Sequence, residues 1–84
     1  METNSAFYEL FYAGERIPGI KYRHNSHVAF VRADGTRCEG AIVSVSPVGP
    51  EPTYTVECGD GSGDEDVLES KLELIADPHE NPTT

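Results

Sequence analysis

The sequence lacks tryptophan, has one methionine and two cysteines, and contains no long apolar run. A membrane-spanning helix needs about 20 apolar residues, and a secretory signal needs a basic start followed by an apolar stretch. We therefore expect neither a membrane partner nor a secretory signal. At 84 residues the chain is long enough for one domain with a small core.

Basic residues are also scarce: six Lys and Arg stand against fifteen Asp and Glu, for a net charge of −9. Residues 1–42 hold five of each sign, whereas residues 43–84 hold one base and ten acids. A phosphate backbone would be repelled by that second half. We expect a protein partner with a basic or mixed surface, and we do not expect nucleic acid.

The stretch from His27 to Cys58 carries the clearest structural pattern. Apolar residues alternate in three short runs, which is typical of strands with one buried face. Asp34-Gly35 separates the first two runs and is typical of a two-residue type I′ turn. A Pro/Gly loop at 47–52 separates the second run from the third. We predict a three-stranded antiparallel meander.

The strand pairing decides where the cysteines point. A two-residue turn places Val31 opposite Cys38 and Phe30 opposite Glu39, so Cys38 lies on the outer face while Cys58 lies on the inner face. Because a disulfide cannot pass through a sheet, we predict two free thiols. Free thiols indicate a reducing compartment, so we expect the protein in the cytoplasm.

The second loop extends the same face to the third strand, with Val45 opposite Tyr54 and Val43 opposite Val56. The predicted inner face comprises Val28, Phe30, Ala41, Val43, Val45, Tyr54, Val56 and Cys58.

Residues 1–23 form an aromatic extension. Phe7, Leu10 and Phe11 stand at helical spacing, but the aromatic content suits a strand equally well. We expect these aromatics either to cover an open end of the domain or to form an exposed patch for a partner or a homodimer.

Beyond the meander, the pattern predicts a fourth strand at Asp64–Leu68, with Val67 inward, and a 3₁₀ turn at Glu69–Lys71. A fifth strand follows, with Leu72, Leu74 and Ile75 as its apolar residues. The chain thus divides into an aromatic extension (1–23), a barrel (24–76) and a disordered tail (77–84).

This order of elements resembles the five-stranded SH3-like barrel, particularly its Tudor and KOW branches, over residues 27–75. Gly40 interrupts the second strand where such a barrel bends. The resemblance implies a mainly all-β fold and a small binding module.

The functions of that superfamily carry over only weakly. Tudor-like modules bind methylated side chains in an aromatic cage, but our pairing buries Phe30 and Tyr54. KOW-like modules bind RNA through basic loops, and only Arg32 and Arg37 lie near the first hairpin. The type II dihydrofolate reductases share the layout, but the place of their Val-Gln-Ile-Tyr signature is occupied by residues 66–69, without its Gln or Tyr.

No catalytic or metal-binding constellation stands out. His24 and His27 have the spacing of a metal pair, but the predicted strand puts Cys38 too far from them to share an ion. The acidic turn after Cys58 lacks the Gly and Glu positions of an EF-hand loop. We expect no enzyme activity, no cofactor and no metal.

The sequence therefore predicts a small, acidic, non-catalytic protein-interaction module. The alternatives are a nucleic-acid-associated KOW-like barrel, an acidic nucleic-acid mimic and a small oligomeric reductase. The candidate partner-binding residues are Glu57, Asp60, Asp64, Glu65, Asp66, Glu69, Arg32, Arg37, Phe7 and Phe11.

Overall fold

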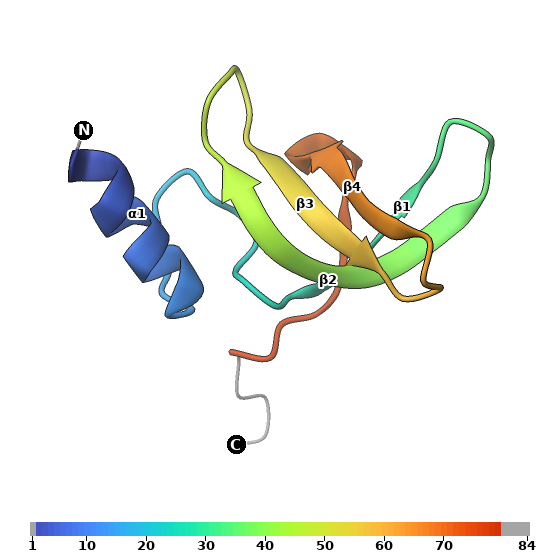
Figure 1. Ribbon diagram of the computed structural model, residues 1–84, viewed down its shortest axis with the longest axis horizontal. Coiled ribbons are helices and arrows are strands. Elements are labelled where there is room, and N and C mark those ends of the chain that lie inside the picture. Colours follow the sequence, from blue (N-terminus) through green and yellow to red (C-terminus); the bar gives the residue numbers. More distant parts are fainter. Residues whose placement is uncertain (1, 80–84) are drawn as a thin grey trace.

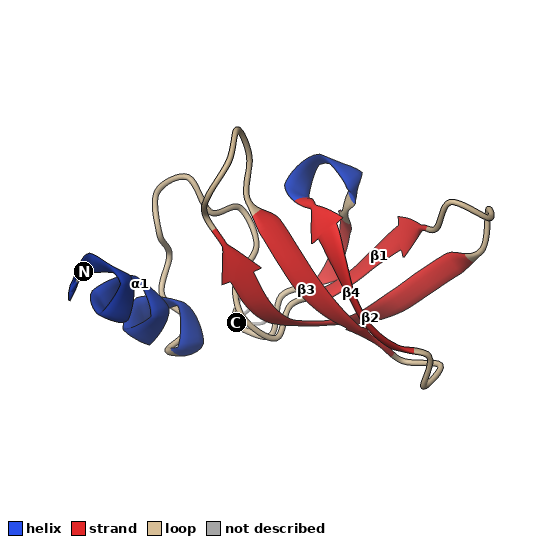
Figure 2. Ribbon diagram, turned by 45° about the horizontal axis from the view of Figure 1, so that its top comes forward, coloured by secondary structure: helices blue, strands red, loops and turns tan. Residues whose placement is uncertain are grey.

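The computed structural model describes residues 2–79 and shows one helix beside one antiparallel five-stranded sheet (Figure 1). The elements are α1 (Glu2–Tyr12), β1 (His27–Val31), β2 (Arg37–Ser46), β3 (Thr53–Cys58), β4 (Gly63–Leu68), the 3₁₀ turn η1 (Glu69–Lys71) and β5 (Glu73–Ala76). The strand order is β4-β3-β2-β1-β5. In Figure 2 the helix lies to one side of the strongly curved sheet.

A mainly β fold with five strands and a 3₁₀ turn before the last one is confirmed. The predicted closed barrel is not: β4 and β5 remain the two ends of the sheet instead of pairing. Each end strand therefore has one edge without a neighbouring strand in the described part of the chain.

The first hairpin turns with one more residue than predicted. The Arg32 N–H donates to the Thr36 carbonyl at 2.8 Å, and the Gly35 N–H donates to the Arg32 carbonyl at 2.9 Å. Gly35 has a φ of 90°, which is the left-handed conformation of the last residue in a three-residue loop. The Asp34 carboxylate stabilises this loop by accepting from the Thr36 N–H at 3.0 Å.

The longer loop shifts the pairing of β1 with β2 by one residue. Val31 pairs with Arg37, and Phe30 pairs with Cys38, so the predicted pairing of Val31 with Cys38 is wrong. Because successive side chains of a strand alternate between faces, this slip turns Cys38 inward.

The pairing of β2 with β3 starts as predicted, with Val45 opposite Tyr54. An irregularity between residues 42 and 44 then bulges Val43, so Ile42 takes its place opposite Val56. The predicted inner positions of Val43 and Ala41 are wrong for this reason: Ile42 is fully buried, and these two are only partly covered.

Both shifts bring Cys38 and Cys58 to the same face, where they form a disulfide across a Cα–Cα distance of 5.9 Å. The prediction of two free thiols is therefore wrong. Both side chains lie in the core, together with Val28, Phe30, Ile42, Val45, Tyr54 and Val56.

Gly40 lies where β2 crosses closest to β3. A Cβ atom at this position would overlap the backbone carbonyl of Glu57. The glycine is thus required by a close approach of two backbones, as expected for a strand glycine at a bend.

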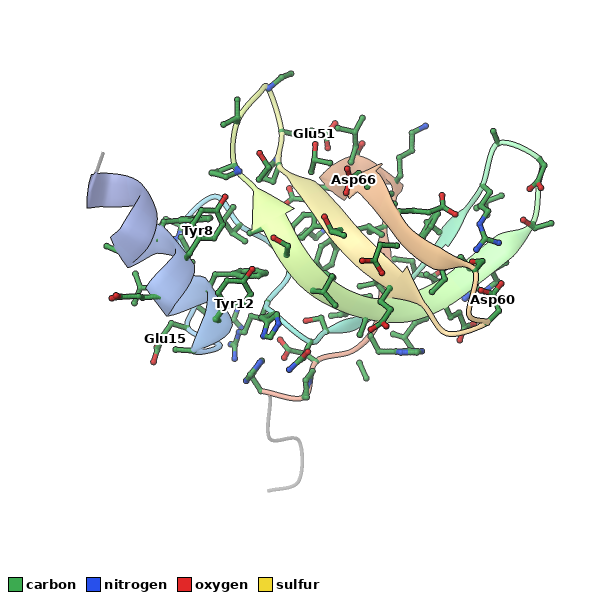
Figure 3. All side chains as sticks on the ribbon, viewed as in Figure 1. Tyr8, Tyr12, Glu15, Glu51, Asp60 and Asp66 are labelled. Atoms are coloured by element: carbon green, nitrogen blue, oxygen red, sulfur yellow. A yellow bond between two sulfur atoms is a disulfide. The ribbon has the colours of Figure 1, made fainter. Side chains whose placement is uncertain are left out.

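The N-terminal extension forms the helix rather than a strand. Phe11 is 1% exposed and belongs to the core, and Phe7 and Tyr8 pack against it from the edge. Tyr8 and Tyr12 point from α1 toward the sheet, whereas Glu15 points away (Figure 3). The aromatics therefore cover one end of the sheet.

The last two strands differ in burial. Val67 of β4 points inward, as predicted. Leu72, just before β5, is buried, but Leu74 and Ile75 are exposed, together with the rest of β5.

The chain continues from β5 across the lower end of α1. Asp77 forms an ion pair with Arg23 at 3.6 Å, and the His79 imidazole meets the backbone carbonyl of His24 at 2.8 Å. A Cβ atom at Gly14 would overlap the same ring, so a side chain there would force the ring to move. The remainder of the predicted tail, 80–84, lies outside the described residues.

Candidate functional site

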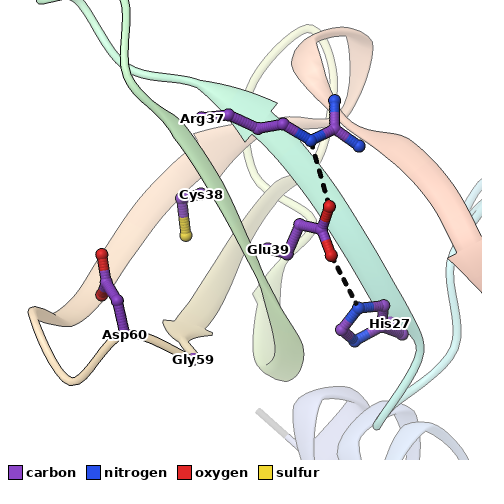
Figure 4. A pocket seen from close by; sticks show the side chains of 6 residues that line it. All are labelled: His27, Arg37, Cys38, Glu39, Gly59 and Asp60. Carbon is purple, nitrogen blue, oxygen red and sulfur yellow. Dashed lines mark hydrogen bonds and ion pairs between the residues drawn. The ribbon is translucent and has the colours of Figure 1, made fainter.

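A shallow depression of about 460 Å³ lies between the first residues of β2 and the turn that follows β3 (Figure 4). It is lined by His27, Arg37, Cys38, Glu39, Gly59 and Asp60. A second depression of about 450 Å³ continues from it toward β3 and is lined mostly by small residues, with Glu57 as its only other carboxylate besides Glu39. The two depressions are thus lined by glycines together with charged side chains.

The charges beside His27 largely neutralise one another. The Arg37 Nε donates to the Glu39 carboxylate at 3.1 Å, and the His27 Nε2 approaches the other oxygen at 3.4 Å. The Arg37 guanidinium and then His27 hold the pKa of Glu39 below its ordinary value. Arg37 also reaches Glu73 of β5 at 3.5 Å, so this base is already engaged on two sides.

Arg32 joins the first hairpin to the turn between β3 and β4. Its Nε donates to the Glu65 carboxylate at 2.6 Å, and one terminal nitrogen donates to the Ser62 hydroxyl at 2.8 Å. The same nitrogen lies 3.6 Å from the Asp60 carboxylate. The hydrogen bond from Arg32 to Glu65 raises the pKa of the guanidinium further. Asp60 and Glu65 therefore serve the structure by holding Arg32.

Glu69 is also engaged inside the molecule. It accepts a 2.6 Å hydrogen bond from the Tyr54 hydroxyl and a 3.0 Å bond from the Lys21 N–H. The Tyr54 hydroxyl in turn accepts from the N–H groups of Lys21 and Tyr22. Burial, and then the bond to Glu69, raise the pKa of Tyr54 far above its ordinary value. This network fastens the segment after α1 to the sheet.

Three carboxylates are left on the outer face of β3 and β4. Glu57 and Asp64 lie directly opposite each other in the strand pairing, and both are exposed. Within residues 2–79 neither forms an ion pair or a side-chain hydrogen bond, whereas Asp66 accepts only a 2.7 Å bond from the Thr55 hydroxyl. Like charges directly opposite in a sheet are destabilising, so this pair costs the fold some stability.

The two aromatic candidates, Phe7 and Phe11, differ in their exposure to solvent. Phe11 is enclosed by the core and has no surface to offer a partner. Phe7 lines a groove of about 410 Å³ between the turn at residues 17–20 and the loop at 47–52. Of the two, only Phe7 remains a surface candidate.

The structure therefore divides the ten predicted residues into three groups. The residues that hold parts of the fold together are Arg32, Arg37, Asp60, Glu65 and Glu69. Phe11 lies in the core. The residues that remain available at the surface are Glu57, Asp64, Asp66 and Phe7. Glu39 and Glu73, which pair with Arg37, were not among the predicted residues, and His27 was considered only as half of a metal pair. One signal in the sequence could have revealed the error in the predicted strand pairing. That pairing set Glu39 opposite Phe30 and would have put a carboxylate on the core face, which is unfavourable.

Among the described side chains, no group of three or more His, Cys, Asp and Glu is arranged to hold a metal ion. His24 is packed against the rings of Phe11 and Tyr12, and Cys38 is in the disulfide. Over the same range, no helix is long and apolar enough to cross a membrane. Comparison with protein families, curated proteins and solved structures finds nothing that matches this chain.

Proposed function

We propose that this protein is a non-catalytic interaction module of SH3-like layout that binds a basic segment of a protein partner. The binding surface is the outer face of β3 and β4, and Glu57, Asp64 and Asp66 are its contact residues. The order of the five strands, with one 3₁₀ turn before the last, supports the SH3-like layout.

The observation that carries the proposal is the pair of opposed carboxylates, Glu57 and Asp64. The nearby bases do not relieve their repulsion, because Arg32 is held by Glu65 and Arg37 by Glu39. A lysine or arginine of a partner, placed between the two carboxylates, would relieve it and gain two charge contacts at once.

The same geometry bears on the nucleic-acid alternative. Arg32 and Arg37 are the bases that a KOW-like module would direct at phosphates, and each already contacts two carboxylates. A phosphate would have to displace these carboxylates and approach a surface of like charge. The arrangement therefore favours a basic protein segment.

The proposal is tested with a fluorescent peptide in which arginine alternates with glycine, by anisotropy at increasing salt. Glu57→Gln combined with Asp64→Asn should weaken binding about fivefold, the effect of removing two exposed ion pairs, and should flatten the salt dependence.

The matched control is Glu9→Gln on α1 with Glu15→Gln just after it. It changes the net charge equally, from −9 to −7, and both side chains lie exposed. Equal weakening by the two double variants would show that the peptide responds only to net charge and would overturn the proposed surface. Retention of single-stranded RNA at physiological salt would favour the nucleic-acid alternative.

The disulfide bears on where the module works. The expectation of a cytoplasmic location rested on free thiols, and the Cys38–Cys58 bond removes that support. Disulfides persist in oxidising compartments. Trapping the thiols by alkylation in unreduced extracts decides the location: a closed bond indicates an oxidising compartment, and two labelled cysteines indicate the cytoplasm.

A further inference from the structure

The free edge of β5 is the least protected part of the sheet. β5 pairs with β1 on one side, with Leu74 opposite Val28 and Glu73 opposite Ala29. It is the last strand in the sheet order, so no strand among the described residues pairs with its other side. The register shifts between His27 and Val28, which leaves Ile75 without an opposite residue.

The side chains of this edge strand are apolar and exposed. Leu74 is 47% exposed and Ile75 is 43% exposed. A strand laid along this edge would therefore cover exposed apolar surface while pairing with the unpaired backbone groups.

The charges at this edge are neutralised. Glu73 is the only charged residue of β5 and forms an ion pair with Arg37 at 3.5 Å. Asp77, just after the strand, pairs with Arg23 at 3.6 Å. On a chain of net charge −9, this edge therefore imposes little electrostatic penalty on an incoming uncharged segment.

We propose that the β5 edge binds an extended segment of a protein partner, which adds to the sheet as a sixth strand. The segment is uncharged where it pairs, with apolar residues at alternate positions. Main-chain hydrogen bonds supply the attraction, and contacts with Leu74 and Ile75 supply selectivity. This surface is separate from the acidic face of β3 and β4, and its binding does not require charge.

A second copy of the chain fits this edge less well than a partner segment. Two copies would each carry a charge of −9. A pair of four-residue strands also buries far less than the roughly 800 Å² per partner of a typical stable interface. An extended uncharged segment of another protein avoids the repulsion between two acidic chains, and a weak, transient contact does not need an interface of that size.

The test uses the full chain, labelled for NMR, and a blocked peptide in which valine alternates with threonine. This probe has no charge, so the acidic face cannot attract it. We expect peptide-dependent shift changes and slowed amide exchange confined to β5 and the adjoining residues of β1. Shift changes centred on β4, or none at millimolar peptide, would overturn the proposal.

Ile75→Lys should weaken peptide binding about tenfold or more, because a charged side chain on an edge strand opposes pairing. The matched control is Val48→Lys, which makes the same kind of change in an exposed loop residue and should bind like the wild type. Ala76→Lys provides a second edge variant if Ile75→Lys does not give a folded spectrum. Shifts at β5 that appear with protein concentration alone would identify a second copy as the occupant and overturn the partner assignment.

Discussion

The two end strands of the sheet occupy equivalent positions but carry opposite chemistry. β4 presents Asp64, Glu65 and Asp66 in succession, and β5 presents Leu74 and Ile75. Charged residues on an edge strand prevent pairing with other chains, so β4 is protected and β5 is not. The difference indicates two kinds of binding surface: an acidic one that suits a basic segment, and an edge that suits backbone pairing with an extended segment.

The two ends are also fastened differently. The disulfide joins β2 to β3 next to the β4 hairpin, and Arg32 holds the β3–β4 turn. β5 relies on its pairing with β1 and on the exposed ion pair of Glu73 with Arg37. We expect β4 to be the more rigid of the two edges.

Reduction of the disulfide should produce the largest change. The two cysteines are 20 residues apart, and opening a loop of that size costs about 3 kcal/mol of unfolding free energy. Denaturant unfolding with and without reductant measures this loss. If the disulfide is what makes β4 more rigid than β5, reduction should accelerate amide exchange at β4 until it matches that of β5. The double variant Cys38→Ala with Cys58→Ala should be insensitive to reductant, and a wild type equally insensitive would contradict the prediction.

Tyr54→Phe should act on both ends, because Glu69 lies between β4 and β5. The change removes the donor to Glu69 and leaves the buried N–H of Tyr22 without its acceptor. An unsatisfied buried group costs about 1–3 kcal/mol of unfolding free energy. Tyr12→Phe is the control, because its exposed hydroxyl makes only a 3.3 Å bond to Ser44 and should cost about 0.5 kcal/mol or less. Equal losses in the two variants would argue against the network.

Asp64→Val with Asp66→Val should abolish the difference between the edges. With these two carboxylates gone, only Glu65, which is paired with Arg32, remains charged on β4. We then expect association that increases with protein concentration in sedimentation velocity. Glu9→Val on α1 with Glu15→Val just after it changes the net charge equally and should stay monomeric. If both double variants associate alike, net charge rather than edge protection keeps the chains apart.

Mild acid should have the smallest effect, confined to the β5 side. Burial, and then the nearby His79, lower the pKa of His24. The unfolded chain therefore takes up this proton first, near the ordinary histidine pKa of about 6.5, and stability falls as the pH drops below that value. The loss ends once the folded His24 is also protonated.

Unfolding measured from pH 8 down to pH 5.5 should show this loss, and amide exchange should rise near residues 77–79 before it rises at β4. His24→Gln should remove the slope, and His27→Gln should keep it. A slope unchanged in His24→Gln would assign the titration to another group.

The predicted elements survive in the structure because they depend on local pattern. Alternation in His27–Cys58 produces the three strands, and the 3₁₀ turn forms at the predicted residues 69–71. The errors in strand register begin at the turn and at the bulge, where one additional residue changes the face of every side chain that follows. Gly35 ends a three-residue loop instead of completing a two-residue turn, and the slip exchanges the faces of Cys38 and Glu39.

The sequence indicated the candidate site only as a set of charged and aromatic residues. Which acids are available depends on partners that are distant in the chain: Glu65 lies 33 residues from Arg32, and Glu69 lies 15 residues from Tyr54. The repulsive pair of Glu57 and Asp64 exists only because the strand register sets them opposite each other.

The sequence by itself determined the strands, the places where the chain turns between them and the concentration of acid in the second half, because each follows from short-range pattern or composition. Tertiary structure decided the disulfide, the open ends of the sheet and the exposure of Leu74 and Ile75. The physical reason is that a strand has a period of two residues. A single bulge or a longer turn, chosen by the packing of the whole sheet, reverses which side chains face the core.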